Sequence, residues 1–350
     1  MDKVVLTQYE KDLIKKNQKY IQNNDWDGFF EAIRDFGLSH IFQFCLECVP
    51  DLMYKITRLP DYSFRDSDIK SIVIPNNIKE IGDGAFEFCK NLKSITISNS
   101  VTEIGYEVFY NCENLESVTI PDSVTEIGEN AFDGCNNLKH ISIPDSVTSI
   151  GDYAFYNCKS LTSITIPDSV TSIGRKAFGY CESLTSITIP DSVTKIGSFA
   201  FALCESLTNI TIPNSVTEIG NYTFEGCESL EKFKIPDSVT KIGYSVFRDC
   251  TSLKHISIPD SVTEIGDYAF DVCESLTNIT IPNSVTKIGN FAFSDCYNLT
   301  HINIPDSVTE IGNNVFYGCD SLKHISIPKY LEGIQFLEDL PKDCEVEVRS

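Results

Sequence analysis

The stretch IPDSVTSIGDYAFYNCKSLTSIT, residues 143–165, is one unit of a sequence that recurs along most of the chain. Ile-Pro occurs at residues 74–75 and then every 23 residues from 120–121 to 327–328, with Ile-Ser at 97–98 in the one position between them. No insertion or deletion interrupts this spacing. A period in the twenties is typical of a solenoid, in which each unit is one coil that cannot bury its apolar face alone.

Each unit predicts two short extended segments. LTSITI (161–166) alternates apolar and polar residues, which indicates a half-buried strand. PD (167–168) should end the strand, because proline cannot donate to a ladder and Asp bonds readily to nearby backbone N–H groups. VTSIG (170–174) predicts a second edge with glycine at a turn, and we expect a helix or 3₁₀ segment of one to two turns around residues 177–181 to close the coil.

Two side-chain columns predict the core. Phenylalanine recurs every 23 residues from Phe86 to Phe316, and eleven of the fourteen cysteines recur with the same period from Cys89 to Cys319. Large rings beside small thiols would fill a tube of stacked coils. Reduced cysteine behaves as a small apolar residue, so we predict free buried thiols. Some bridging is the alternative, since coils ~5 Å apart would permit it.

The repeat also resembles a known family. The pattern I-P-x-x-V-x-x-I-G-x-x-A-F-x-x-C-x-x-L-x-x-I-x, over residues 74–328, is similar to the BspA-like class of leucine-rich repeats. The resemblance implies an α/β solenoid: a right-handed arc of about eleven to twelve coils with a parallel strand ladder on its concave face. It also implies a recognition scaffold, because known members include bacterial surface adhesins and protist and viral families of unknown role.

Four segments are predicted along the chain. Residues 1–58 are expected to form an N-terminal helical cap or docking module, and residues 59–73 a degenerate half-repeat with Phe64 in the place of the core phenylalanine. Residues 74–328 form the solenoid. Residues 329–350 form a C-terminal cap, because a solenoid exposes an apolar cross-section at each end.

Both caps carry specific expectations. Helices are predicted over about 7–23, after Asn24 and through 41–52, and the second should have Trp26, Phe29, Phe30 and Ile33 on one face. Cys45 and Cys48 have the spacing of half a zinc site, but no second pair follows, so we interpret them as core. At the C-terminal end, Ile334, Phe336, Leu337 and the alternating CEVEV (344–348) suggest a closing strand.

Charge and hydropathy limit the partners. The formal charge of −22 repels nucleic acid and anionic membrane, and no apolar run is long enough to span a bilayer. The first residues, MDKVVLTQYE, lack the apolar segment of a secretory signal. We therefore expect a cytoplasmic protein, with a surface or secreted location only if an upstream signal is missing.

The outward residues of the predicted strands are the candidate binding surface, because leucine-rich repeats usually bind there. They are neutral to basic although the chain is acidic, and aspartates follow the prolines along a rim. The predicted partner is another protein, with a glycan also possible. The candidate binding residues are Lys139, His140, Lys232, Lys234, Lys254, His255, His301, Lys323 and His324.

A second column of charge precedes the Ile-Gly of each unit. It alternates in sign over six units from Lys195 to Glu310, which we interpret as a structural ladder on the surface. In the first units it is Glu80, Glu103 and Glu126. Like charges should repel there, so this acidic stripe is a further candidate partner site.

Two places in the sequence are candidates for a metal site. His301 and His324 fall on neighbouring coils and could share a metal, but no carboxylate in their columns completes a site. The Asp rim could hold Ca²⁺, although Asp after Pro more often caps a turn. We therefore predict no metal and no cofactor.

The sequence contains no pairing of nucleophile, base and acid, no phosphate-binding glycine loop and no paired carboxylates typical of catalysis. The leading hypothesis is a non-catalytic protein-interaction scaffold. The alternatives are a surface adhesin for host matrix protein or glycan, and an acidic inhibitor of viral origin that imitates nucleic acid.

Overall fold

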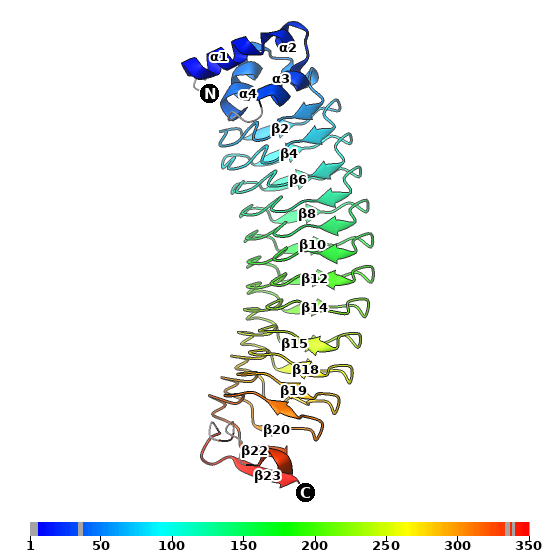
Figure 1. Ribbon diagram of the computed structural model, residues 1–350, viewed down its shortest axis with the longest axis vertical. Coiled ribbons are helices and arrows are strands. Elements are labelled where there is room, and N and C mark those ends of the chain that lie inside the picture. Colours follow the sequence, from blue (N-terminus) through cyan, green and yellow to red (C-terminus); the bar gives the residue numbers. More distant parts are fainter. Residues whose placement is uncertain (1–5, 34–37, 333–336, 338–339, 350) are drawn as a thin grey trace. The chain divides into compact units, whose positions relative to one another are not determined.

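The structure is a computed structural model that describes residues 6–33, 38–332, 337 and 340–349. The chain forms two compact units, Met1–Ser169 and Val170–Ser350. Each unit is a stack of coils in which three-residue strands lie on one side and two-residue strands form a second edge (Figure 1). We call the surface of the three-residue strands the strand face.

Unit 1 begins with helices and continues with strands. Its elements are α1 Gln8–Lys16, α2 Gln18–Gln22, α3 Trp26–Ile33, α4 Leu38–Cys48, the 3₁₀ helix η2 Leu52–Tyr54, β1 Arg58–Leu59, β2 Ser71–Val73, β3 Glu80–Ile81, β4 Ser94–Thr96, β5 Glu103–Ile104, β6 Ser117–Thr119, β7 Glu126–Ile127, β8 His140–Ser142, β9 Ser149–Ile150 and β10 Ser163–Thr165.

Unit 2 consists almost wholly of strands. Its elements are β11 Ser172–Ile173, β12 Ser186–Thr188, β13 Lys195–Ile196, β14 Asn209–Thr211, β15 Lys232–Lys234, β16 Lys241–Ile242, β17 His255–Ser257, β18 Glu264–Ile265, β19 Lys287–Ile288, β20 His301–Asn303, β21 Glu310–Ile311, β22 His324–Pro328, the 3₁₀ helix η3 Lys329–Leu331 and β23 Glu345–Arg349.

The strands pair in parallel with the 23-residue offset of the sequence. In unit 1, Ile164 of β10 lies opposite Ile141 of β8, and in unit 2, Glu264 of β18 lies opposite Lys241 of β16. The central Ile141 is 6% exposed, whereas the residues on either side of it in β8 are exposed. The predicted half-buried strand ladder is confirmed.

The core is the predicted pair of columns. Phe132 stacks on Phe155 with ring centroids 5.3 Å apart in unit 1, and Phe178 stacks on Phe201 at 5.5 Å in unit 2. The cysteines from Cys89 to Cys319 are buried free thiols. Thiols of this column donate to a phenylalanine carbonyl of an earlier coil: Cys158 Sγ donates to Phe132 O, 26 residues earlier, at 3.2 Å, and Cys89 Sγ to Phe64 O, 25 residues earlier, at 2.9 Å. The small thiol therefore both fills space and satisfies a carbonyl.

The segment that closes each coil is not the predicted helix. In the coil at 174–181, Lys176 and Tyr180 have φ values of 54° and 59°, in the left-handed region. Alternate amides then bond to the next coil, Phe178 N–H to Ala200 O at 2.8 Å among them, while Gly179 N–H bonds locally to Lys176 O. A helix would keep all these amides within the coil, so tandem turns that join neighbouring coils are used instead.

The N-terminal helices cover the start of the ring column. Thr7 caps α1 in a capping box with Glu10, and the first predicted helix is divided at Asn17. Trp26, Phe29, Phe30 and Ile33 of α3 are buried on one face, as predicted. Phe42 of α4 packs edge-on against Phe64 at 5.3 Å, and Phe64 stacks on Phe86 at 5.1 Å.

The chain closes with the predicted C-terminal strand. β23 pairs in parallel with β22, and Ile325 lies opposite Val346. This offset is 21 residues, two fewer than in the repeats. Of the apolar residues predicted here, Leu337 is half-buried, and Ile334 and Phe336 lie outside the described residues.

Candidate recognition surface

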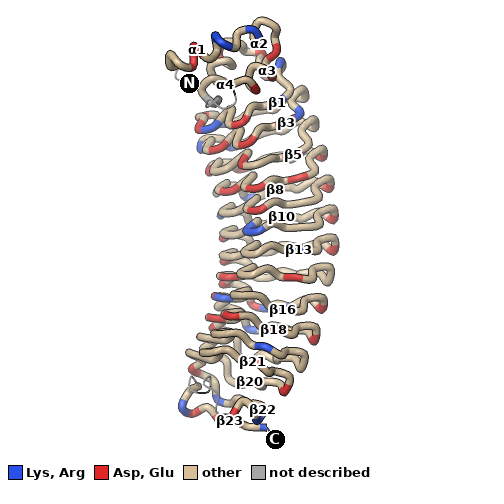
Figure 2. The backbone as a smooth tube through the Cα atoms, viewed as in Figure 1, with Lys and Arg blue, Asp and Glu red and all other residues tan. Residues whose placement is uncertain are grey.

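All nine predicted binding residues lie on the strand face or directly beside it. Lys139 and His140 belong to unit 1, and the other seven belong to unit 2. His324 is half-buried and the other eight are exposed. Figure 2 shows that acidic segments recur at the loops that join the strands in both units.

Several strand-face lysines are already paired with carboxylates. Lys254 Nζ lies 3.3 Å from Glu231, and Lys93 lies 3.1 Å from Glu116. Lys234 contacts Asp237 more loosely, at 3.7 Å. Glu116 and Glu231 are thus neutralised by neighbours in their own column, and each exposed pair contributes little to stability.

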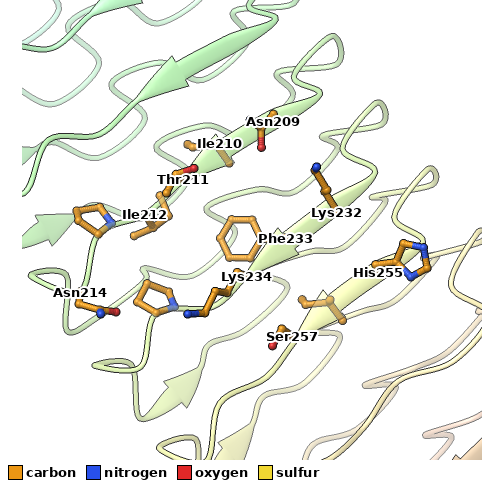
Figure 3. Close-up of a pocket in the computed structure, with 13 residues that line it drawn as sticks. Asn209, Ile210, Thr211, Ile212, Asn214, Lys232, Phe233, Lys234, His255 and Ser257 are labelled. Carbon is orange, nitrogen blue, oxygen red and sulfur yellow. The ribbon is translucent and has the colours of Figure 1, made fainter.

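The strand face of unit 2 contains a hollow of ≈ 700 Å³ between β14, β15 and β17 (Figure 3). Lys232 and Lys234 lie at the two ends of β15, with the Phe233 ring between them. Polar groups from Asn209, Thr211, Asn214, His255 and Ser257 and apolar groups from Ile210, Ile212, Pro213, Pro236 and Ile256 complete the lining. None of the lining residues is acidic. We call this the strand-face hollow.

Phe233 lies at the centre of the hollow. It replaces the isoleucine found at this position in most repeats and is 4% exposed, packed against Phe224 at 5.0 Å and Phe247 at 4.9 Å. Within the described residues 170–332, β15 hydrogen-bonds to β17 but not to β14. The neighbouring Ile256 is half-buried, whereas Ile210 is 5% exposed. The larger ring fits the core, and the ladder is interrupted beside it.

Carboxylates that the sequence did not predict lie beside the histidine pair at the C-terminal end. His301 and His324 have ring centroids 6.1 Å apart. The prediction that no carboxylate lies beside them is wrong, because Glu345 lies opposite His324 in the register and Glu347 lies 3.7 Å from His324 Nε2. The offset of 21 residues brings these carboxylates into place. Even so, no group of three or more potential ligands suited to a metal occurs among the described residues.

The acidic stripe is partly neutralised. Arg58 of β1 contacts Glu80 at 2.6 Å and Asp61 at 2.5 Å, so Glu80 is not a free carboxylate. Glu103 and Glu126 lie opposite each other on β5 and β7 and are exposed, as expected from the sequence. The stripe therefore reduces to two neighbouring glutamates.

The alternating charge column is confirmed as a ladder in its second half. Glu264 lies 2.9 Å from Lys241 and 3.6 Å from Lys287. The hydrogen bond from Lys241 lowers the pKa of Glu264, despite partial burial. This column stabilises the register and leaves little unbalanced charge for a partner.

Serine, rather than the expected aspartate, joins the turns along the rim. Ser192 Oγ donates to Val170 O of the preceding coil at 2.7 Å, and Ser215 does the same to Val193. The rim aspartates Asp122, Asp145, Asp168, Asp191, Asp237, Asp260 and Asp306 are exposed. Their charge lies at the margin of the strand face, where it repels acidic surfaces.

A ladder of aromatic side chains in unit 2 escaped the sequence analysis. Phe199 stacks on Tyr222 at 4.2 Å, and Tyr268 stacks on Phe291 at 4.9 Å, with Tyr244 between the two pairs. Within the two stacked pairs the ring faces cover each other, whereas Tyr244 is tilted by 53° and 54° from its neighbours and is 38% exposed. The stacked pairs therefore stabilise the coils of unit 2. The signal in the sequence was the recurrence of Phe199, Tyr222, Tyr268 and Phe291 at one phase of the repeat, with Tyr244 one residue before that phase.

No helix among the described residues is long and apolar enough to cross a membrane.

Comparison with known proteins identifies the repeat. The family model described as BspA type leucine rich repeat region (6 copies) matches residues 57–184, 172–270 and 245–337. A leucine-rich repeat protein from Bacteroides ovatus is 32% identical, with a TM-score of 0.59 over 84% of this chain and 88% of its own. A leucine-rich cell surface protein from Faecalibacterium prausnitzii is also 32% identical, with a TM-score of 0.57 over 84% and 83%.

A search of curated proteins gives no significant match. The matched residues carry the Ile-Pro, Phe and Cys columns from which each coil is built, and they cover far more than half of the sequence. The chain belongs to the BspA-type leucine-rich repeat family.

Proposed function

We propose that the chain is a non-catalytic scaffold that binds a partner protein through the strand face of unit 2. The observation that carries the proposal is the strand-face hollow, which is rimmed by Lys232, Lys234 and His255 in a chain of net charge −22. A concave, partly apolar site with a few convergent polar groups is the usual form of a binding site. Lys232, Lys234 and His255 lie on the paired strands β15 and β17 above the stacked core, so they are positioned before a partner arrives.

Side-chain chemistry supports recognition over catalysis. Two hydroxyl groups of the strand face approach a histidine: Thr300 Oγ1 lies 3.0 Å from His301 Nδ1, and Ser163 Oγ lies 3.5 Å from His140 Nδ1. The Thr300 hydroxyl donates to Thr277 O at 3.2 Å, and the second distance is at the limit of a hydrogen bond. No described carboxylate forms an ion pair with either histidine, whereas a catalytic pair would need an orienting acid.

The test compares two charge-matched variants as baits for partner proteins. K232E/K234E alters the hollow, and K195E/K329E makes the same change in charge at exposed lysines outside it. A partner kept by the wild type and the control but lost by K232E/K234E would support the proposal. A partner retained equally by both variants would contradict it. Far-UV circular dichroism and thermal melting verify that both variants remain folded.

A second candidate is recognition at a cell surface, where the partner would be a matrix protein or glycan. It is favoured by the similarity to the F. prausnitzii cell surface protein. This role and the cytoplasmic location predicted from the first residues exclude each other. Fractionation of the native cells distinguishes them, because protease added outside intact cells would digest only a surface protein.

A further inference from the structure

We propose that the strand-face hollow binds a carboxylate-bearing, extended segment of the partner, and that Phe233 is the specificity-determining residue that creates this subsite. The inference rests on the proposed function and names the chemistry that the same surface would select. It assigns different tasks to three residues: Lys232 and Lys234 supply charge, and Phe233 supplies the space.

The charge of the hollow favours a carboxylate. Residues 232 and 234 are two apart on one strand, so both lysines point outward on the same side. Each ammonium has three donors and no acceptor. His255 lies opposite Lys232 in the register and Ser257 opposite Lys234, so further donors flank both lysines.

The carboxylates nearby leave this charge available. Glu231 is occupied by Lys254 at 3.3 Å, and Asp237 contacts Lys234 at 3.7 Å with both side chains largely exposed. No described carboxylate forms an ion pair with Lys232. The rim aspartates would repel an acidic chain elsewhere on this margin, so charge directs such a chain to the hollow.

The shape of the hollow favours an extended segment over a single ion. Its volume of ≈ 700 Å³ is in the range of pockets that hold several groups at once. Ile210, Phe233 and Ile256 form an apolar floor between the polar ends. A segment that alternates acidic and apolar side chains matches the two lysines at the ends of β15 and the apolar floor between them.

Phe233 makes the site distinct from the other coils. Most coils carry isoleucine here, and β12 pairs with β14 so that Ile187 lies opposite Ile210. The ladder also stops between β6 and β8 and after β17, but only the coil of β15 has an aromatic ring at this position. F233I would restore the repeat residue while keeping both lysines. We expect the ladder to close, the hollow to shrink and the affinity to fall without any change in charge.

The experiment measures fluorescence anisotropy of two labelled peptides with the full chain. One peptide alternates Glu and Val, and the control peptide alternates Gln and Val. The Glu peptide should bind about tenfold more tightly than the Gln peptide, and the difference should shrink at high salt. K232Q/K234Q and F233I should each weaken binding of the Glu peptide about tenfold, whereas K195Q/K329Q should leave it unchanged.

Three results would overturn the inference: no binding of the Glu peptide to the wild type, equal binding of the two peptides, or full affinity in F233I. K232Q/K234Q changes only exposed side chains, so the test does not depend on the folding of F233I alone. If the peptides fail while K232E/K234E still loses its protein partner, the proposed function stands and the inference falls. If the Glu peptide binds as expected but K232E/K234E and K195E/K329E both retain the partner protein, the hollow binds carboxylates and the proposed function falls.

Discussion

Replacing Gly128 with alanine should destabilise unit 1, whereas the same change at Gly105, one coil earlier, should not. Both are the glycine of the V-T-x-I-G segment. A Cβ atom added at Gly128 would lie 2.8 Å from the carbonyl carbon and 2.9 Å from the oxygen of Gly105. These are backbone atoms that cannot turn aside. A Cβ added at Gly105 would meet only Asp83 Oδ1, at 3.5 Å, which is an ordinary contact.

The magnitude follows from two opposing effects. Forcing extra atoms into a close-packed place costs about 1–3 kcal/mol. Replacing glycine with alanine also restricts the unfolded chain, which stabilises the protein by about 0.4–1 kcal/mol where the native conformation suits alanine. We therefore expect G128A to lose roughly 1–2 kcal/mol and G105A to range from neutral to about 1 kcal/mol more stable.

The assay is hydrogen exchange measured by mass spectrometry, because repeat proteins need not unfold in one step. Gly128 N–H bonds to Ile104 O at 2.7 Å, and Thr125 N–H bonds to Thr102 O at 2.9 Å. In G128A these amides should exchange about tenfold faster, since 1.4 kcal/mol corresponds to a factor of ten. Equal protection in the two variants would refute the view that close approach of successive coils requires glycine here.

Three further outcomes are expected. E264Q removes a surface ion pair with Lys241, so it should lower the free energy of unfolding by about a few tenths of a kcal/mol at neutral pH and leave it unchanged near 1 M salt. The stability difference between wild type and E264Q should also vanish as the pH falls through the lowered pKa of Glu264, and a difference that persists in acid would contradict this. Burial raises the pKa of Asp133 to about 7, so the contribution of this protonated carboxyl to the free energy of unfolding is complete below its ordinary pKa and is lost as the pH rises to about 7. In urea titrations D133N should gain stability relative to the wild type over that pH range, and a difference that does not change with pH would contradict the prediction. Ellman's reagent should modify the exposed Cys48 first and the half-buried Cys344 next. The thiols of the buried column should react only on unfolding, because burial raises their pKa, that of Cys204 to about 12, and early modification of this column would show that the coils open.

The strand-face hollow was only half visible in the sequence. Lys232, Lys234 and His255 could be placed on one surface, because a fixed period and strand alternation determine which residues share a column. The departure of Phe233 from isoleucine was equally visible. Its consequence was not, because whether a larger ring compresses the core or interrupts the ladder depends on the packing of Phe224 and Phe247 around it.

The closing segments were misjudged for a different reason. A helix was expected at 177–181 because apolar residues there suit either a helical turn or tandem turns. The choice between them is made by the neighbouring coil, whose carbonyls accept the alternate amides. Left-handed conformations at residues as large as Lys176 and Tyr180 are unfavourable in isolation, so local preference alone could not predict them.

The sequence by itself determined the solenoid, its 23-residue register and the Phe and Cys columns, because each coil repeats the same apolar pattern and contacts only its neighbours. Only the tertiary structure determined the contacts that depart from the 23-residue period. Arg58 lies beside Glu80, the 21-residue offset of β23 places Glu347 beside His324, and the ladder stops between β14 and β15, where the hollow lies. Contacts between equivalent positions can be counted along the chain, whereas contacts made at a cap or around an oversized side chain depend on how the coils pack in space.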